Sequence, residues 1–509
     1  MSDHVMFDVA VVGAGPAGIA AALSASAAGA RVVVIDEQRR PGGQIFRQPP
    51  REFVGSKAKF SAGYPWAYDL LEQADAAPGI TWKHESTAFG VFRDRAEDSL
   101  QGTADPSPEG IQLAISGPNG AERLPVRRLL IATGAYDLPV AIPGWTLPGV
   151  MMAGAVQGFI KSQRLLVSER LVLAGSHPLL LVVADQLRAS GADIAEIAFA
   201  RGLPSLREAF GALPAVPGHT RLFAETGVAL TRLIAAGVRI STRTVATRAV
   251  GTDRVEGAEL ARIDENWKVK GSPRVVPAST LVLGYGFQAS TELARQAGCT
   301  MLYNSAKGGW IVAHDQNMAT SSPGIYVAGE PTGVAGAEQS RAEGHLAGLA
   351  IAQDLGFGRA RSRARARASD RDHSLTTATD DLTSAVESAR TDVHHAQKFS
   401  SVVQSMFAPN RKGLAALATP DTIVCRCELV TQDTVTNVLA HNPHLSSASG
   451  VKLECRSGMG PCQGRYCETT VASLVAIERG RSIADVGSFT AHVPVKPVPV
   501  SALTVLDGE

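Results

Sequence analysis

Val11-Val12-Gly13-Ala14-Gly15-Pro16-Ala17-Gly18 is the stretch that decides the fold, because it places three glycines in the pattern GxGxxG directly after an apolar run. Residues 7–12 predict a strand, the Ala-rich stretch that reaches Gly29 predicts a helix, and residues 31–36 predict a second strand. A glycine motif is informative in this strand, turn, helix and strand context. The sequence therefore predicts a βαβ unit that binds a dinucleotide.

Each glycine of the motif has its own role. Gly13 permits the tight turn, Gly15 lets the backbone approach a pyrophosphate, and Gly18 lets the helix pack closely on the strand. Asp36 follows Gly13 by 23 residues, where a carboxylate can accept hydrogen bonds from a ribose hydroxyl. The residues expected to contact the dinucleotide here are Gly13, Gly15, Pro16, Ala17, Gly18, Asp36 and Glu37.

Two later segments indicate which dinucleotide is bound. Residues 129–135 form an apolar strand that ends in a small-residue turn, and residues 324–330 form another strand that precedes an Ala/Gly-rich helix. They resemble the later flavin-contacting motifs of flavoproteins with two dinucleotide-binding domains, which usually have Asp where this chain has Glu330. FAD is therefore expected, with contacts from Ala132, Thr133, Gly134, Gly329 and Glu330, and with Gly43, Gln44 and Arg47 near the flavin. Lys307 and Trp310 are weaker candidates, and these loop residues could instead only pack the lobes together.

Residues 170–200 predict a second βαβ unit whose glycine motif is degraded. His177 and Leu180 stand where the second and third glycines would be, and the second strand ends at Ala200-Arg201 without a ribose-binding acid. A side chain at position 177 would crowd the approach of a pyrophosphate. We expect this domain to be retained for packing and not to bind nicotinamide, although another nucleotide remains open.

Five of the six cysteines lie between residues 425 and 467. Cys425-x-Cys427 and Cys462-x4-Cys467 offer four thiolates in two pairs, the number that a [2Fe–2S] cluster or a structural zinc requires. Structural zinc commonly uses C-x2-C pairs, which neither pair matches, so a [2Fe–2S] cluster is favoured over zinc or no metal. Cys455 is a fifth thiol and could replace Cys462 as a ligand.

The composition excludes several other classes of protein. The 509 residues are 45% apolar, with a mean hydropathy of +0.05, as in ordinary globular proteins. Because 49 basic residues balance 48 acidic ones, no global charge favours nucleic acid. The longest apolar region, residues 165–184, is interrupted by charges, so no transmembrane span is expected. The first residues lack a basic signal-peptide region, so we expect a cytoplasmic protein.

These patterns predict an α/β flavoprotein with two dinucleotide-binding domains and a small α-rich [2Fe–2S] domain. The expected FAD domain comprises residues 1–150 and 285–356, and residues 151–284 form the inserted NAD(P)-like domain. An Arg-rich linker, 357–404, is expected to be a solvated spacer or short helix. The cluster domain is expected at 405–480 and an extended Pro-rich tail at 481–509, along a neighbouring subunit or along its own flavin domain.

Four segments resemble the FAD- and [2Fe–2S]-containing α subunits of heteromeric amino-acid dehydrogenases, a group that includes opine oxidases and hydrogen cyanide synthase. They are residues 42–47, 132–136, 143–150 and 458–467. The resemblance implies a bacterioferritin-associated-ferredoxin type of cluster domain with ligands Cys425, Cys427, Cys462 and Cys467. It also implies a partner β subunit of the D-amino-acid-oxidase kind, which carries its own FAD and the substrate site.

The same resemblance implies that the chain passes electrons from the partner through FAD and [2Fe–2S] to an acceptor, and the sequence leaves open whether that acceptor is a quinone, a soluble carrier or oxygen. It leaves open an FMN at a subunit interface, a small third subunit, and a position at the periphery of the inner membrane. The residues agree, because no Ser/His/Asp array, catalytic carboxylate pair or C-x-x-C disulfide beside the flavin is recognisable. The alternatives are a self-contained NAD(P)H-dependent reductase and an iron-handling binding module.

Overall fold

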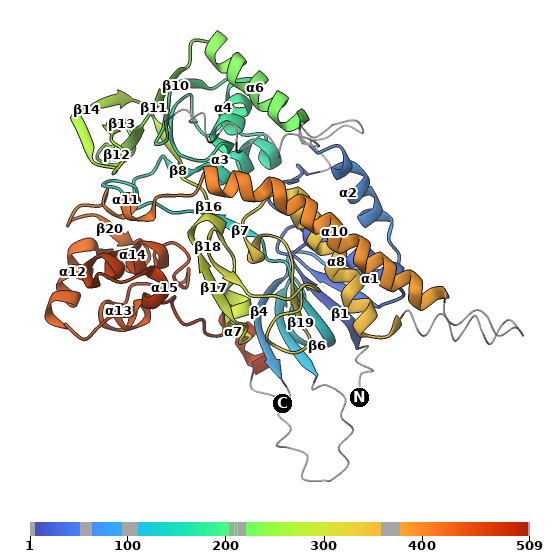
Figure 1. Cartoon of the computed structure of the whole chain (residues 1–509). Helices are drawn as coiled ribbons and strands as arrows, with labels where there is room; N and C mark the ends of the chain where they lie inside the picture. The colour runs from blue at the N-terminus through green and yellow to red at the C-terminus, as the bar shows by residue number, and fades with distance from the viewer. Residues whose placement is uncertain are drawn as a thin grey trace, which may run out of the picture.

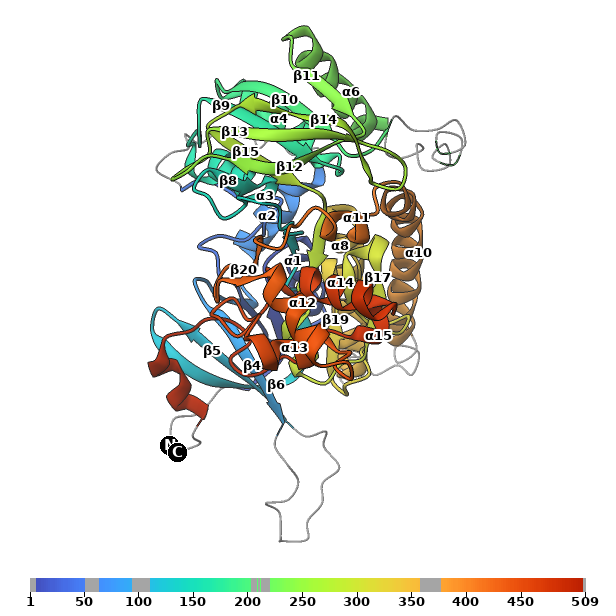
Figure 2. The same cartoon turned by 90° about the vertical axis from the view of Figure 1, so that its left-hand side faces the viewer.

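The computed structural model describes residues 6–50, 64–93, 110–202, 220–357 and 377–506, together with residues 208 and 211. In Figure 1 the inserted domain lies above the flavin domain, and the carboxy-terminal cluster domain lies at its side. Figure 2 shows the cluster domain from the front, over the flavin domain and below the inserted domain. The predicted flavoprotein fold with an additional α-rich domain is confirmed.

A seven-stranded sheet forms the centre of the flavin domain, in the order β3-β2-β1-β6-β5-β4 with β19 paired to β6. β1, β2, β3 and β19 run parallel to their neighbours, whereas β4, β5 and the first half of β6 form an antiparallel extension. The strands are β1 (Phe7–Val12), β2 (Val32–Ile35), β3 (Ile80–Lys83), β4 (Thr87–Arg93), β5 (Ile111–Gly117), β6 (Gly120–Ile131) and β19 (Ile325–Val327).

Helices α1 (Pro16–Ala27) and α8 (Ala337–Asp354) pack together on this sheet, and α2 (Trp66–Ala76) lies beside them. Glycines allow the close crossing, because a Cβ at Gly344 would lie 2.0 Å from the Ala17 oxygen. Smaller elements complete the domain: α7 (Glu292–Gln296), β7 (Ala135–Asp137) paired with β16 (Phe287–Ala289), β17 (Met301–Asn304) paired with β18 (Gly309–Val312), and the short 3-10 turns η5 (Ser305–Lys307) and η6 (Glu330–Thr332).

The inserted domain contains a five-stranded parallel sheet, β11-β10-β9-β15-β8, and an antiparallel sheet, β12-β13-β14. The strands are β8 (Val150–Met152), β9 (Arg170–Gly175), β10 (Asp193–Phe199), β11 (Arg239–Thr242), β12 (Thr244–Val250), β13 (Gly257–Ile263), β14 (Val269–Pro277) and β15 (Thr280–Gly284). Its helices are α3 (Ala153–Gly158), the π-helix η3 (Phe159–Gln163), α4 (Leu179–Ala189) and α6 (Thr220–Ala235). The predicted second βαβ unit is thus present as β9, α4 and β10.

The segment expected to be an Arg-rich linker, 357–404, is not simply a solvated spacer. Its Arg-rich beginning, from Arg359 to residue 376, lies outside the described residues. The remainder forms α10 (Thr377–Met406), a helix of 30 residues that runs along α8 in Figure 1. Val386, Ala389 and Val393 are buried in the same core as α1 and α8. Apolar residues at helical spacing therefore make this segment part of the flavin domain surface.

The cluster domain is built mainly from short helices. Its elements are α11 (Arg411–Ala415), β20 (Ile423–Cys425), β21 (Val430–Thr431), α12 (Gln432–His441), α13 (Ala448–Cys455), α14 (Glu468–Arg479) and α15 (Ile483–Val486). The tail then follows its own flavin domain, where Val495 donates to the Phe89 oxygen and η7 (Val500–Leu506) receives bonds from Arg123. None of the helices within the described ranges has the length and hydropathy needed to cross a bilayer.

Candidate flavin and iron–sulfur sites

The glycine turn between β1 and α1 leaves open space for a pyrophosphate. A Cβ at Gly13 would lie 2.3 Å from the Ala132 oxygen, and one at Gly18 would lie 1.8 Å from the Gly13 oxygen, so packing requires both glycines. A Cβ at Gly15 would instead have only the Gly43 Cα near it, at 4.0 Å. No side chain caps α1, so its first N–H groups are available to an anion. This cradle fits the pyrophosphate of FAD.

Asp36 lies at the end of β2, as predicted, and also holds the glycine turn in place. Its Oδ2 accepts a bond of 2.6 Å from the Ala14 nitrogen, and its Oδ1 accepts one of 2.7 Å from the Gln38 nitrogen. Burial raises the pKa of Asp36, and these two N–H groups act against that rise. Glu37, the next residue, pairs at 2.6 Å with Lys496 of the tail. Its carboxylate is thus engaged by the chain itself.

Glu330 lies shortly after β19, the strand predicted to lead to a flavin contact, and its carboxylate accepts bonds of 3.0 Å from the Ala335 and Gly336 nitrogens. Burial raises the pKa of Glu330 to about 7, and the nearby Glu343 adds to the rise. Glu343, which sequence reasoning missed, is fully buried on α8 and accepts a bond of 2.8 Å from the Gly329 nitrogen. Two carboxyl groups, and not one, therefore hold the loop that follows β19.

Replacing Glu330 by Gln should flatten the pH dependence of FAD retention. The folded-state pKa of about 7 exceeds the ordinary value of 4.5, so the folded chain holds a proton that the unfolded chain releases. The free energy of unfolding therefore falls as pH rises from about 4.5 to about 7. The fall is roughly 3 kcal/mol for a pKa difference of about 2.5. The temperature of flavin release, measured from pH 5 to 8, should fall less in Glu330→Gln than in the unchanged protein. Parallel curves would contradict this assignment.

The predicted flavin neighbours Gln44 and Arg47 contact one another, with Arg47 Nη2 donating to Gln44 Oε1 at 2.7 Å. Sequence reasoning missed Lys161 of η3, which donates to the Ile45 oxygen at 3.1 Å. Burial, followed by the charge of Arg47, lowers the pKa of Lys161 to about 8. Lys161 follows no motif in the sequence, because only the docking of the inserted domain brings it to this loop. Near neutral pH it can hold or release a proton.

The turn after β6 places Thr133 and Gly134 beside the other flavin segments. Thr133 Oγ1 donates to the Ser290 oxygen at 2.7 Å, which ties the turn to the segment after β16. Gly134 has a φ of +76° and no atom within 4 Å of a Cβ built on it, so this turn also leaves open space.

The structure brings Cys425, Cys427, Cys462 and Cys467 together at the base of α14. Side-chain hydrogen bonds pair Cys425 with Cys467 and Cys427 with Cys462, and charge interactions connect the two pairs. The bond from Cys467 is the main cause that lowers the pKa of Cys425 to about 6, and the Gly458 nitrogen also donates to Cys425 Sγ at 3.4 Å.

Two pairs of thiols fit a binuclear cluster better than a single ion. Among the described residues no group of three or more His, Cys, Asp or Glu side chains is arranged to hold one metal ion. A [2Fe–2S] cluster needs two thiolates for each iron, and the four cysteines supply that number. Cys455 lies apart, with its thiol directed to the Val451 oxygen at 3.2 Å and to Ser457 Oγ at 3.3 Å.

The Pro-Gly-Trp segment supports the strand that carries the first cysteine pair. Trp145 is 4% exposed, and its Nε1 donates to the Ile423 oxygen on β20 at 2.6 Å. Arg426, between the two cysteines, donates to the Thr146 oxygen at 3.3 Å. In the sequence, this segment only contributes to the family resemblance. Its structural role is to fix the cluster domain against the inserted domain.

The degraded second nucleotide site is filled by the chain itself. His177 is half-buried and lies edge-on against the Phe287 ring at 5.0 Å, with the Phe407 ring at 6.4 Å. Burial lowers the pKa of His177 to about 4, which keeps the ring neutral. Arg201, at the end of β10, lies over the Phe407 ring at 5.4 Å. Phe407, which follows α10, thus covers the ends of both strands where a nucleotide would approach.

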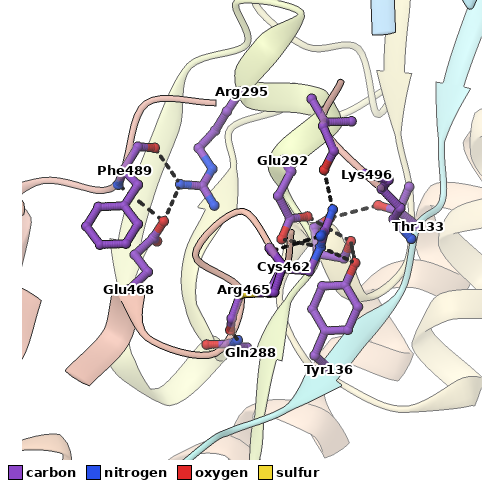
Figure 3. A network of polar contacts seen from close by, with 12 residues as sticks. Thr133, Tyr136, Gln288, Glu292, Arg295, Cys462, Arg465, Glu468, Phe489 and Lys496 are labelled. Carbon is purple, nitrogen blue, oxygen red and sulfur yellow. Dashed lines mark hydrogen bonds and ion pairs between the residues drawn. The ribbon is translucent and has the colours of Figure 1, made fainter. Parts of the chain in front are cut away.

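The loop between Cys462 and Cys467 inserts Arg465 into the flavin domain (Figure 3). Arg465 Nε donates to the Tyr136 hydroxyl at 3.2 Å and lies 3.5 Å from Glu292, while Nη1 donates to the Cys462 oxygen at 2.9 Å. One side chain therefore connects the cysteine loop with β7, the strand that follows the predicted flavin turn at Thr133 and Gly134.

The comparisons with known proteins agree with these sites. Residues 7–345 match the family Pyridine nucleotide-disulphide oxidoreductase, and residues 423–477 match the BFD-like [2Fe-2S] binding domain. The opine oxidase of Rhizobium meliloti has a subunit that is 33% identical, over 98% of this chain and 88% of that protein. Hydrogen cyanide synthase subunit HcnB of Pseudomonas aeruginosa is 31% identical, over 98% of both. L-Proline dehydrogenase from P. horikoshii shares the fold, with a TM-score of 0.61 and 19% identity, over 98% of this chain and 79% of that one.

The fold and the two sites define an FAD-dependent oxidoreductase of the pyridine nucleotide-disulphide class that carries a [2Fe–2S] domain. Within that class, the chain belongs to the family of α subunits of heteromeric amino-acid dehydrogenases that includes HcnB and the opine oxidase subunit. It is therefore an oxidoreductase subunit of a heteromeric complex.

Proposed function

We propose that this chain is the electron-transfer α subunit of a flavin-dependent amino-acid or opine dehydrogenase. Its partner is a β subunit of the D-amino-acid-oxidase kind, which carries its own FAD and oxidises the amine. FAD, bound between the β1–α1 turn and the loops after β6 and β19, supplies two-electron chemistry, and the cluster held by Cys425, Cys427, Cys462 and Cys467 supplies one-electron chemistry.

The observation that carries this proposal is the insertion of Arg465 from the cysteine loop into the flavin domain (Figure 3). The Arg465 side chain is 8% exposed, so the contact is a packed interface and not a surface encounter. A rigid joint of this kind keeps two redox groups at a fixed separation. The filled site at His177 and Phe407 further supports a chain that receives its electrons from a protein and not from nicotinamide.

Purification of a tagged copy from its native host, followed by mass spectrometry, tests the proposal. A second flavoprotein should accompany the chain in stoichiometric amount, and the pair should oxidise an amine that the isolated chain does not. Amine oxidation by the chain alone would contradict the assignment of the substrate site to the partner.

Stoichiometric NADH or NADPH should leave the flavin of the holoprotein oxidised over minutes, because Phe407 and His177 fill the second nucleotide site. The flavin absorbance, followed anaerobically after mixing, measures this directly. Bleaching within seconds would instead support the alternative of a self-contained NAD(P)H-dependent reductase.

Further details of the proposal rest on the family resemblance alone. They are an FMN at the interface with the β subunit, a small third subunit, a quinone or soluble carrier as electron acceptor, and a cytoplasmic location at the periphery of the inner membrane. Flavin analysis of the purified complex, by chromatography after denaturation, would show FMN in addition to FAD.

A further inference from the structure

A cavity of about 30 Å³ lies between the flavin domain and the cluster domain. Its walls come from β16, α7 and the β17–β18 hairpin on one side, and from α11, the cysteine loop and α14 on the other. In both Figure 1 and Figure 2, β17 of the flavin domain lies beside α14 of the cluster domain. A space of this size holds about two water-sized molecules. It is therefore too small for a nucleotide, a flavin or an amino acid.

Buried donors end in this cavity without a hydrogen-bond partner in the described part of the chain. They are Arg411 Nε and Nη2, Arg295 Nε and Trp310 Nε1, and the Thr291 and Tyr303 hydroxyls lie unpartnered beside them. Arg411 is 6% exposed and Thr291 is 1% exposed. Guanidinium and indole N–H groups can only donate. Since buried polar groups are nearly always paired, these donors indicate that an acceptor belongs in the cavity.

The charges that line the cavity do not cancel. Three arginines, Arg295, Arg411 and Arg465, face two glutamates. Both carboxylates are engaged, because Glu468 pairs with Arg295 at 2.8 Å and Glu292 lies 3.5 Å from Arg465. Arg411 has no carboxylate within 4.0 Å among the residues that the structure describes, and the charge of Glu468, which is already paired with Arg295, reaches it only from a longer distance. Leaving one buried guanidinium without a counter-charge is strongly unfavourable.

We propose that this cavity binds a small monovalent anion, a halide or a planar oxyanion such as formate or bicarbonate. Arg411 supplies the counter-charge, and Trp310 Nε1 and Arg295 Nε donate hydrogen bonds from the flavin domain. Because Arg411 belongs to α11 and the other donors belong to the flavin domain, the anion joins the two domains beside the cysteine loop.

Crystals of the holoprotein soaked in sodium bromide provide a direct test. Anomalous scattering should show one bromide ion within hydrogen-bond distance of Arg411 and Trp310. Only water density at this position, with bromide found solely on the surface, would overturn the proposal.

Titration in solution gives an independent test that does not need crystals. The holoprotein is exchanged into sodium gluconate, whose anion is too large for the cavity, and bromide or formate is added at constant ionic strength. The temperature at which the visible absorbance of the cluster is lost should rise to a plateau in the unchanged protein. Arg411→Met should show no such rise, and Trp310→Phe should need a roughly two- to tenfold higher anion concentration.

Arg411→Met also distinguishes an anion site from a merely structural arginine. Without added anion the variant should be at least as stable as the unchanged protein, because it removes an unpaired buried charge. Arg39→Met is the matched control, since that side chain is 81% exposed and pairs with Glu85 at the surface. Equal plateaus in all four proteins would indicate a general salt effect and contradict the site.

Discussion

Replacing Cys467 by Ser should remove the iron–sulfur cluster from the chain. Cys467 is 1% exposed at the start of α14, and its side chain contacts Cys425 across the site, so no other group can take its place. A missing thiolate leaves one iron of a binuclear cluster with a single protein ligand. Bound iron should fall by an order of magnitude or more, because even the loss of an outer contact lowers metal affinity about 10–100-fold. Iron analysis and the visible and EPR spectra measure it.

Cys455→Ser is the matched control for this change. Cys455 is a cysteine of the same domain, but its thiol is directed to the backbone of its own helix α13 and to Ser457. This variant should keep full iron content and an unchanged spectrum. If Cys455→Ser lost the iron and Cys462→Ser kept it, Cys455 and not Cys462 would be the cluster ligand. The sequence alone left that alternative open.

The flavin fold could be predicted because its signals are local. The strand, glycine turn and helix of residues 7–27 are adjacent in the chain, and Gly13 and Gly18 each answer a steric need that the structure shows, while Gly15 leaves open space. The four cysteines also lie in two short sequence motifs, but the contacts between their side chains, Cys425 with Cys467 and Cys427 with Cys462, join one motif to the other. Local motifs specify local geometry, so β1 and α1 were found where expected.

Contacts that depend on how domains dock could not be predicted. Lys161 reaches the Ile45 oxygen only because the inserted domain folds back on the flavin loop, and Phe407 fills the second nucleotide site from more than 200 residues away in the chain. The segment around Val386 was misread because its polar residues outnumber the few apolar ones that contact α8. A short apolar stripe on a charged helix is a weak signal until its partner is known.

Replacing Gly15 by Ala should abolish tight FAD binding while leaving the protein folded. Gly15 has a φ of −79° and a ψ of −176°, an extended conformation that alanine adopts readily. The only atom near the new Cβ would be the Gly43 Cα at 4.0 Å, so the protein itself accommodates the methyl group. That methyl group would occupy the space from which a pyrophosphate reaches the first N–H groups of α1.

The expected effect of Gly15→Ala is roughly a hundredfold or greater loss of FAD affinity, since two charge-assisted bonds at about 1.5–3 kcal/mol each would be lost. Iron content should stay unchanged, because the cysteines lie in another domain.

Gly227→Ala on α6 is the control, since no atom of the described residues lies within 4 Å of a Cβ built at that position, and this variant should retain FAD. Gly18→Ala should behave differently again: its Cβ would lie 1.8 Å from the Gly13 oxygen, so the fold itself should be disrupted. Full FAD affinity in Gly15→Ala, measured by titration of the flavin-free protein, would place the pyrophosphate elsewhere.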